Sequence, residues 1–271
     1  MTLYRSFLVF ILLVCFSFPT LQAREKKTRH STGYTPTEML EPDATPVKAR
    51  HERLIAKAEE IHIAPLHHGH VNTKVLEGID VSHYQGKIDW NTIGRNGKVA
   101  YAYIKATEGA SLVDDCYERN LHGARRAGIS VGAYHFYRPN IDWQTQFENM
   151  ISTVRLEEQD LIPLVDIETT GGVSNEKLIR DLQHFVNAVT RHYGKRPLLY
   201  TYQNFYNKHL IGHFKEYHWM IACYRDTPPQ LDDNRDHTLW QYTQTGSIEG
   251  IQGNVDRSCL IAPHTLSEIA F

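Results

Sequence analysis

The sequence LVDIE at residues 164–168 follows Pro163 and precedes the run TTGG at residues 169–172. A short apolar run between such breakers is typical of a buried β-strand. Alternate residues of a strand point to one face, so Asp166 and Glu168 should project together from its end. Burying two acids side by side is costly unless they are used, and hydrolysis of a glycosidic bond needs paired carboxylates with different pKa values. The alternative interpretation is a strand-end pair that caps a loop or binds a cation.

Strand and helix patterns alternate on both sides of this segment. Short apolar runs predict strands at residues 75–81, 99–106, 131–137, 164–168 and 197–202. Helical patterns lie between them at residues 88–95, 114–127, 143–156 and 174–193, and a shorter one follows at 205–211. The helix over 174–193 is the clearest, because Ser174 suits the N-cap, Gly194 suits the stop and apolar residues recur at helical spacing.

The alternation of strands and helices stops in the last part of the chain. Residues 219–224, 238–242 and 254–257 fit strands with no room for full helices between them. Alternating strands and helices indicate a parallel sheet with right-handed crossovers. The sequence therefore predicts an α/β fold, a modified TIM-like barrel of five β/α units followed by three strands with few helices. An open doubly wound sheet is the alternative, and it lacks support because no GxGxxG or phosphate loop follows the first strand.

The N-terminal quarter of the chain differs in composition from the rest. Arg5 precedes an apolar run over residues 7–18, and Ala23 offers a cleavage point, so we expect a signal peptide at residues 1–23 and export to the periplasm or beyond the cell. An uncleaved signal would instead anchor the protein to a membrane. Residues 24–74 carry charged and proline-containing stretches and are expected to form a tether with a short helix over 49–63. The barrel domain is expected over residues 75–271.

Composition and charge fit an ordinary globular protein. The 271 residues are 41% hydrophobic and 22% charged, and the net charge of −2 gives no field that favours nucleic acid. Loss of the signal would leave three cysteines, Cys116, Cys223 and Cys259, which allow one bridge plus one thiol or three thiols. We expect no cofactor and no metal, because the close histidines His67, His68 and His70 lie in the tether and no Cys/His zinc spacing occurs.

Acidic residues recur where predicted strands end. Asp80 ends the first strand, Asp166 and Glu168 end the fourth, and Asp256 lies at the last. The active site of a β/α barrel lies at the carboxyl ends of its strands, so these four acids should converge on one acidic pocket. Glu108, after the second strand, is interpreted as a structural acid.

These residues lie in segments that carry a resemblance to a known family. The segments are GIDVS (78–82), YQG (84–86), IKATEG (104–109), GAYHF (132–136), DIE (166–168), LYT (199–201), residues 219–224, WQYT (240–243) and GIQGNVD (250–256). In this order the chain resembles the glycoside hydrolase family 25 muramidases, the cellosyl-type lysozymes. The resemblance covers about residues 76–260 and implies the same modified barrel, acting on the β-1,4 bond between N-acetylmuramic acid and N-acetylglucosamine in peptidoglycan.

The resemblance also implies roles for the acids. Glu168 would be the general acid, and Asp166 would orient or stabilise the 2-acetamido group or the developing oxocarbenium ion. Asp80 and Asp256 would hold water or tune Glu168. A neighbouring carboxylate should raise the pKa of Glu168 and keep it protonated. A double-displacement retaining route and an inverting route are the alternatives. We favour a substrate-assisted route, because same-face neighbours on one strand leave little room for a sugar between them.

Other residues in the same segments are candidates for substrate binding. Lys105 shares a strand face with Tyr101 and Tyr103, and it would bind substrate or pair with a carboxylate of the acidic ring. The sugar-contacting aromatic candidates are Tyr134, Tyr200 and Trp240, whose alternative role is to fill the barrel. His83 and His135 are interpreted as core or supporting histidines.

The expected protein is thus a secreted monomeric lysozyme that binds peptidoglycan glycan strands. Two alternatives stay open on the sequence. One is an inactive barrel that binds peptidoglycan, and the other is a glycosidase acting on another N-acetylated glycan such as chitin.

Overall fold

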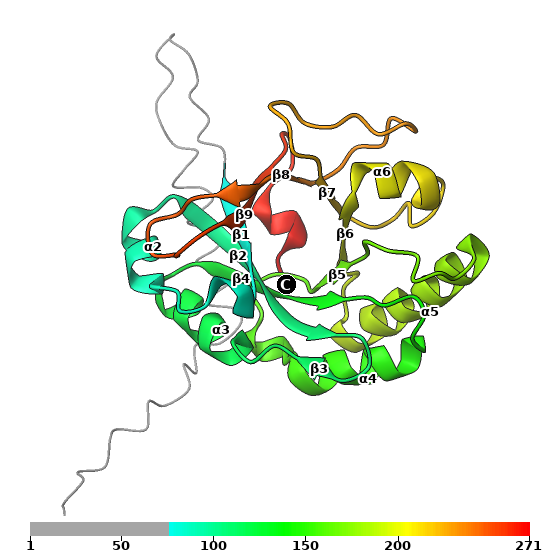
Figure 1. Cartoon of the computed structure of the whole chain (residues 1–271), viewed down its shortest axis with the longest axis horizontal. Helices are drawn as coiled ribbons and strands as arrows, with labels where there is room; N and C mark the ends of the chain where they lie inside the picture. The colour runs from blue at the N-terminus through cyan, green and yellow to red at the C-terminus, as the bar shows by residue number, and fades with distance from the viewer. Residues whose placement is uncertain (1–75) are drawn as a thin grey trace, which may run out of the picture. The chain divides into compact units, whose positions relative to one another are not determined.

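The computed structural model describes residues 76–271 (Figure 1). The predicted signal peptide (1–23), the predicted tether (24–74) and its three histidines lie outside the described residues. Within the described part, no helix has both the length and the apolar character needed to span a membrane.

Eight strands close into a barrel. Their order is β1-β9-β8-β7-β6-β5-β4-β2, and a β1–β2 pairing closes the ring. The strands are β1 (Glu77–Val81), β2 (Val99–Glu108), β4 (Ser130–Phe136), β5 (Leu164–Asp166), β6 (Leu198–Tyr202), β7 (Trp219–Ala222), β8 (Leu239–Gly246) and β9 (Val255–Leu260). A further two-residue strand, β3 (Leu112–Val113), pairs with the end of β2. The predicted barrel of five β/α units plus three strands is confirmed.

The direction of the last strand differs from the fully parallel sheet that alternation implied. Strands β1, β2, β4, β5, β6, β7 and β8 run parallel to one another, whereas β9 is antiparallel to both β8 and β1. The loop 247–254 is too short for a crossover, which takes a dozen or more residues, so the chain turns back as a hairpin. The beginning of β9 therefore lies at the same barrel end as the carboxyl ends of the other strands.

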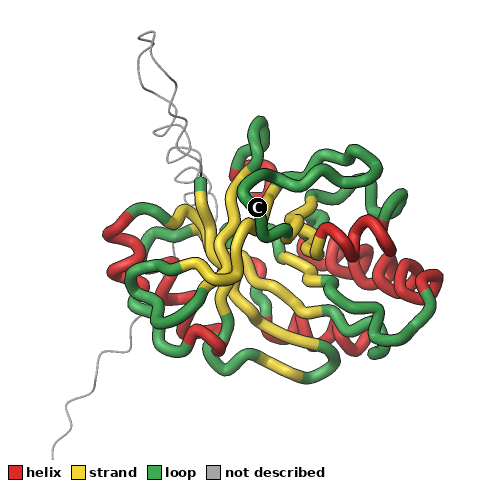
Figure 2. Tube along the Cα trace, turned by 45° about the horizontal axis from the view of Figure 1, so that its top comes forward, coloured by secondary structure: helices red, strands yellow, loops and turns green. Residues whose placement is uncertain are grey.

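Helices surround the strands, as Figure 2 shows. They are α2 (Trp90–Asn96), α3 (Tyr117–Arg126), α4 (Trp143–Thr153), α5 (Asn175–Tyr193) and the short α6 (Gln203–Phe205), which continues into the π-helical turn η3 (Tyr206–Leu210). The predicted ends of α5 are confirmed, because the Ser174 side chain accepts a hydrogen bond from the Lys177 amide and Gly194 adopts a left-handed conformation.

Strand alternation divides the core into two layers. Ile79, Ala102 and Val165 face outward and pack with helix residues, of which Leu182 and Phe185 on α5 are fully buried. The inward layer fills the barrel with large side chains, including Tyr101, Tyr103, Leu164, Tyr200 and Met220. Gly78 makes room for this filling, because a Cβ atom there would lie 2.0 Å from the Tyr101 ring. Side chains therefore fill the barrel below its rim, and a substrate can bind only at the end of the barrel.

Candidate active site

The structure brings the four predicted acids together at the carboxyl end of the barrel. Asp80 on β1 is the direct cross-strand partner of Asp256 on β9. Asp166 is the last residue of β5, and Glu168 lies two residues beyond it. The charge of Asp256 acts on both Asp80 and Glu168, and the charges of Glu168 and Asp80 act on Asp166. The antiparallel return of β9 is what places Asp256 in this group.

Burial raises the pKa values of all four acids. Burial and then the charge of Asp256 raise the pKa of Asp80 to about 8, against a hydrogen bond from Gln241. Burial raises the pKa of Asp256 to about 6. Burial, followed by the charge of Glu168, holds the pKa of Asp166 well above its usual range. Burial and mutual repulsion thus make these acids bind protons more tightly than isolated carboxyl groups do.

Glu168 has the environment that a general acid needs. Its pKa is raised mainly by burial and also by the charge of Asp256, while a hydrogen bond from Tyr202 and the charge of Arg138 lower it. A neighbouring carboxylate is the only cause of a raised Glu168 pKa that the sequence predicts. Burial is the larger cause, because a carboxyl group that has lost its water resists ionisation even without a charged neighbour.

A buried amide holds Asp80. The Nε2 atom of Gln241 on β8 donates to Oδ2 of Asp80 at 2.9 Å. The Oε1 atom of the same amide accepts hydrogen bonds from the hydroxyls of Tyr200, at 2.9 Å, and Tyr224, at 3.1 Å. The side chain of Gln241 is therefore fixed at both ends. Its importance was missed from the sequence, although it lies in the WQYT segment.

Lys105 lies beside the acids but pairs with another one. Its Nζ atom is 2.5 Å from Oε2 of Glu108, and its side chain is 7% exposed. Arg138 binds the other oxygen of Glu108, with Nε at 2.9 Å from Oε1. Burial favours a higher pKa for Glu108, but the hydrogen bonds from Lys105 and Arg138 outweigh it and lower the pKa. Glu108 is thus an ionised acid in a cluster of two cations.

The other candidate residues divide into two groups. Tyr134 on β4 and Tyr200 on β6 pair in register with Leu164 and Asp166 of β5, and the charge of Asp166 reaches both hydroxyls. Trp240 precedes Gln241 on β8, so it points to the opposite face of the strand. Its Nε1 atom donates to the Cys223 carbonyl at 2.8 Å. The structure does not bring Trp240 together with the acids.

Both histidines next to the motifs have structural partners. His135 is fully buried, forms a 2.7 Å hydrogen bond with Thr107 and stacks on Phe185, and burial lowers its pKa to about 4. His83 lies outside the barrel core, with Nδ1 2.6 Å from Oδ2 of Asp114.

Two tyrosines join this site without having been predicted. Tyr202 lies two residues after Tyr200 on β6 and so shares its face, and Tyr224 follows β7. The rings of Tyr202 and Tyr224 meet edge to face, with centroids 6.2 Å apart, and Tyr224 is 40% exposed. The alternation of Tyr200 and Tyr202 was the sequence signal that could have found the first of them.

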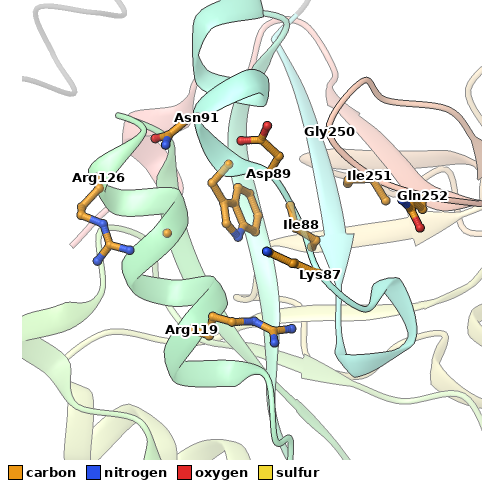
Figure 3. Close-up of a pocket in the computed structure, with 11 residues that line it drawn as sticks. Lys87, Ile88, Asp89, Asn91, Arg119, Arg126, Gly250, Ile251 and Gln252 are labelled. Carbon is orange, nitrogen blue, oxygen red and sulfur yellow. The ribbon is translucent and has the colours of Figure 1, made fainter. Parts of the chain in front are cut away.

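A separate pocket of about 780 Å³ lies outside this acidic site (Figure 3). It is lined by residues of α2 and the segment before it, of α3 and of the loop before β9, among them Lys87, Asp89, Arg119 and Gln252. None of the four acids lines it. The carboxylate of Asp89 caps α2 by accepting hydrogen bonds from Thr92.

Glu118, His122 and Glu158 form a group with spacing suited to a metal, with ligand atoms within 4.8 Å of one another. The Arg155 guanidinium binds Glu158 at 2.8 Å and lies 3.5 Å from Glu118, so a cation already occupies this position. The three cysteines of the described chain, Cys116, Cys223 and Cys259, are free thiols.

Comparison with known proteins connects this geometry to a family. The profile of glycosyl hydrolases family 25 matches residues 79–251. The chain belongs to this family. The uncharacterized protein YegX of Escherichia coli K12 is 35% identical to it over 67% of this chain and 68% of YegX. Lysozyme M1 of Streptomyces globisporus is 31% identical over 70% of this chain and 69% of the lysozyme.

Comparison with solved structures supports the same family. A family 25 glycosyl hydrolase from Bacillus anthracis aligns with a TM-score of 0.67 and 29% identity, covering 77% of this chain and 100% of that one. The resemblance seen in the sequence is confirmed, and the protein is a glycoside hydrolase with the family 25 barrel. The profile match ends before Asp256, which joins the site through its pairing with Asp80.

Proposed function

We propose that this family 25 protein is a secreted lysozyme that hydrolyses the β-1,4 bond between N-acetylmuramic acid and N-acetylglucosamine in peptidoglycan. The observation that carries the proposal is the pair Asp166 and Glu168 at the barrel rim, opposite Asp80 and Asp256. A lysozyme among the relatives supports the choice of substrate. Export rests on the predicted signal peptide over residues 1–23.

In this proposal Glu168 is the general acid. Its raised pKa favours the protonated form, and the proton passes to the glycosidic oxygen as the bond from this oxygen to the anomeric carbon breaks. The acetamido oxygen of the same sugar forms a bond to the anomeric carbon, with Asp166 orienting the acetamido N–H. Water then attacks that carbon as its bond to the acetamido oxygen breaks, and the Glu168 carboxylate accepts a proton from the water, so configuration is retained.

The remaining residues are proposed to bind the substrate or to shift the pKa values of the acids. Asp80 and Asp256 favour the protonated state of the ring of acids, because each resists the ionisation of its neighbours. Tyr134 and Tyr200 would contact the sugar from β4 and β6. Lys105 would favour the anionic form of Asp166, whose pKa its charge lowers. Trp240 would support the rim through its bond to Cys223 and would not touch the reacting sugar.

The test compares the protein starting at Arg24 with its Glu168→Gln variant on isolated peptidoglycan, with mass analysis of the fragments. The expected result is release of muropeptides with muramic acid at the reducing end, and a loss of about 10²- to 10⁴-fold in rate in the variant. Glu157→Gln is the matched control, because Glu157 is exposed on η2 (Leu156–Glu158), away from the acids.

Three other outcomes would contradict the proposal. Retention of the wall by pull-down without fragment release by either protein would indicate a binding barrel. Release of N-acetylglucosamine reducing ends would place the cut at the other bond. Activity on chitin oligomers with none on peptidoglycan would identify a different N-acetylated glycan.

A further inference from the structure

The pocket beside α2 and α3 combines buried apolar residues with exposed cations. Its buried apolar lining residues are Ile88, Trp90 and Ile251. Three exposed cations also line it, namely Lys87, Arg119 and Arg126. In Figure 3 the side chains of Lys87 and Arg119 point toward the space between the segment 87–91 and α3. The pocket therefore offers an apolar surface and positive charge to the same ligand.

One face of α3 forms a wall of this pocket. Arg119, Gly123 and Arg126 lie on that face, because residues four and seven apart recur on the same side of a helix. At the rise of an α-helix the two arginines are about 10 Å apart along its axis. Gly123 between them leaves room for Trp90, since a Cβ atom there would lie 2.3 Å from Cδ1 of the indole. The two cations thus flank a position at which α3 has no side chain.

The charges of these cations are not balanced by ion pairs. Within the part of the chain that the structure describes, no carboxylate lies at ion-pair distance from Lys87, Arg119 or Arg126. Arg119 donates to the Gly86 carbonyl at 2.7 Å, which holds the guanidinium without neutralising it. The carboxylate of Asp89 accepts from the amide and the hydroxyl of α2 at its first turn. The pocket therefore has positive charge available for an anionic ligand.

The loop 247–254 connects the pocket to the acidic site. Gln252 lines the pocket, and Asp256 of the acidic site follows it by four residues. Four residues of chain span at most about 14 Å, which is the length of a short extended peptide. The loop is tied to the pocket on its other side, because the Asp89 amide donates to the Gly250 carbonyl at 2.8 Å. A substrate bound at the acids is thus within reach of the pocket.

We propose that this pocket binds the peptide stem that peptidoglycan carries on its N-acetylmuramic acid residues, while the glycan lies at the acidic site. The identity of the substrate rests on the proposed function, whereas binding of an anionic peptide by the pocket requires no hydrolysis. A stem is a short peptide with several carboxylates and alanine methyl groups. Three residues of extended peptide span about 10 Å, which matches the spacing of Arg119 and Arg126.

Charge complementarity favours this placement of the stem. The carboxylates of a stem are repelled by ionised acids in the catalytic site and attracted by the cations of the pocket. The apolar lining residues would contact the alanine methyl groups. The consequence is a preference for glycan strands that carry stems over strands from which the stems have been removed.

Charge reversal at Arg126 tests this preference. Hydrolysis is compared on soluble glycan strands with their stems and on the same strands after an amidase has removed the stems. We expect Arg126→Glu to lower kcat/KM on stem-bearing strands about 5-fold, through KM, with the loss confined to those strands. Lys87→Glu should act in the same way. Arg126 is exposed, so the fold should tolerate the change.

Arg191→Glu is the matched control. Arg191, like Arg126, is an exposed arginine in the last turn of a helix, but it lies on α5 and does not line the pocket. Both variants therefore change the net charge and the helix terminus equally. We expect Arg191→Glu to hydrolyse both kinds of strand as the unaltered protein does. An equal loss in the two variants would mean that only net charge matters, and it would overturn the proposal.

Binding of the free stem gives a readout that needs no activity. The probe is the tetrapeptide that an amidase releases from peptidoglycan, added to the Glu168→Gln variant and followed by the indole N–H signals of the four tryptophans. The Trp90 signal is assigned by its loss in Trp90→Phe. We expect the peptide to shift this signal, and we expect Arg126→Glu but not Arg191→Glu to weaken the shift. Salt at about 0.5 M should weaken it as well.

The outcomes separate this inference from the proposed function. Equal hydrolysis of both kinds of strand, with no shift of Trp90, would overturn the stem site and leave the muramidase standing. A shift of Trp90 by the peptide in a protein that cleaves no peptidoglycan would overturn the proposed function and leave the peptide site standing. A response to inorganic phosphate with none to the peptide would show a phosphate site and overturn the inference.

Discussion

Two glutamates near the same barrel rim have opposite electrostatic environments. Glu108, at the end of β2, binds Lys105 and Arg138, and its pKa is lowered. Glu168, beyond β5, lies among other acids, and its pKa is raised. Burial acts on both carboxyls in the same direction. At Glu168 burial is the largest cause and the pKa is raised, whereas at Glu108 the hydrogen bonds from two cations outweigh burial and the pKa is lowered.

The comparison separates a structural acid from the acid that is proposed to react. Glu108 uses both oxygens to neutralise two cations, one of which is buried, and has no proton to give. Glu168 has a tyrosine hydroxyl and further carboxyl groups around it, so ionisation of the Glu168 carboxyl is unfavourable. The raised pKa of a half-buried acid in a group of acids is a mark of function, whereas the lowered pKa of Glu108 is a mark of ion pairing.

The largest effect on stability is expected at Glu108. Glu108→Gln leaves Lys105 buried without a counter-charge, which should cost about 3 kcal/mol in the free energy of unfolding. Glu168→Gln removes an acid that resists ionisation and should leave stability unchanged or raise it. Urea unfolding at pH 8 measures both. Equal destabilisation by the two variants would mean that their environments do not differ as described.

A smaller effect should follow the protonation of Asp80. Its folded pKa of about 8 lies above the unfolded value of 3.8, so the folded state binds the proton more tightly. The stability that this adds is present below pH 4 and is lost as pH rises from about 4 to 8. Asp80→Asn should flatten this part of the curve of unfolding free energy against pH, and a slope unchanged by the substitution would contradict the assignment.

Much of the barrel could be predicted because each β/α unit carries its own local signals. The cap and stop of α5 are single residues, Ser174 and Gly194, and the apolar stripe between them has the helical period. The reversed direction of β9 was not predicted, since it follows from the length of the loop 247–254 rather than from the pattern of the strand itself.

The candidate site likewise has features that the sequence predicts and features that it does not. Strand-end position was enough to predict that Asp80, Asp166 and Glu168 meet, because parallel strands present their carboxyl ends together, whereas Asp256 joins them because β9 runs in the opposite direction. The partner of Lys105 and the role of Gln241 depend on how side chains from β1, β2 and β8 meet those of the segments that follow β4 and β7. Strand parity does distinguish Trp240 from Gln241, but only once the inward face of β8 is known.

The smallest effect tests how the cation cluster holds Glu108. Arg138→Lys keeps the charge but gives up the planar guanidinium, which binds Oε1 through two nitrogens and lies 4.4 Å from the Phe136 ring centroid. We expect a loss of about 1 kcal/mol in unfolding free energy and a partial rise in the pKa of Glu108, because one hydrogen bond that lowers it is lost. Thermal unfolding and ¹³C titration of Glu108 measure the two effects. Since Lys105 still binds Oε2, Glu108 should stay ionised at neutral pH, and a shift large enough to protonate it there would show that Arg138 alone separates the two glutamates.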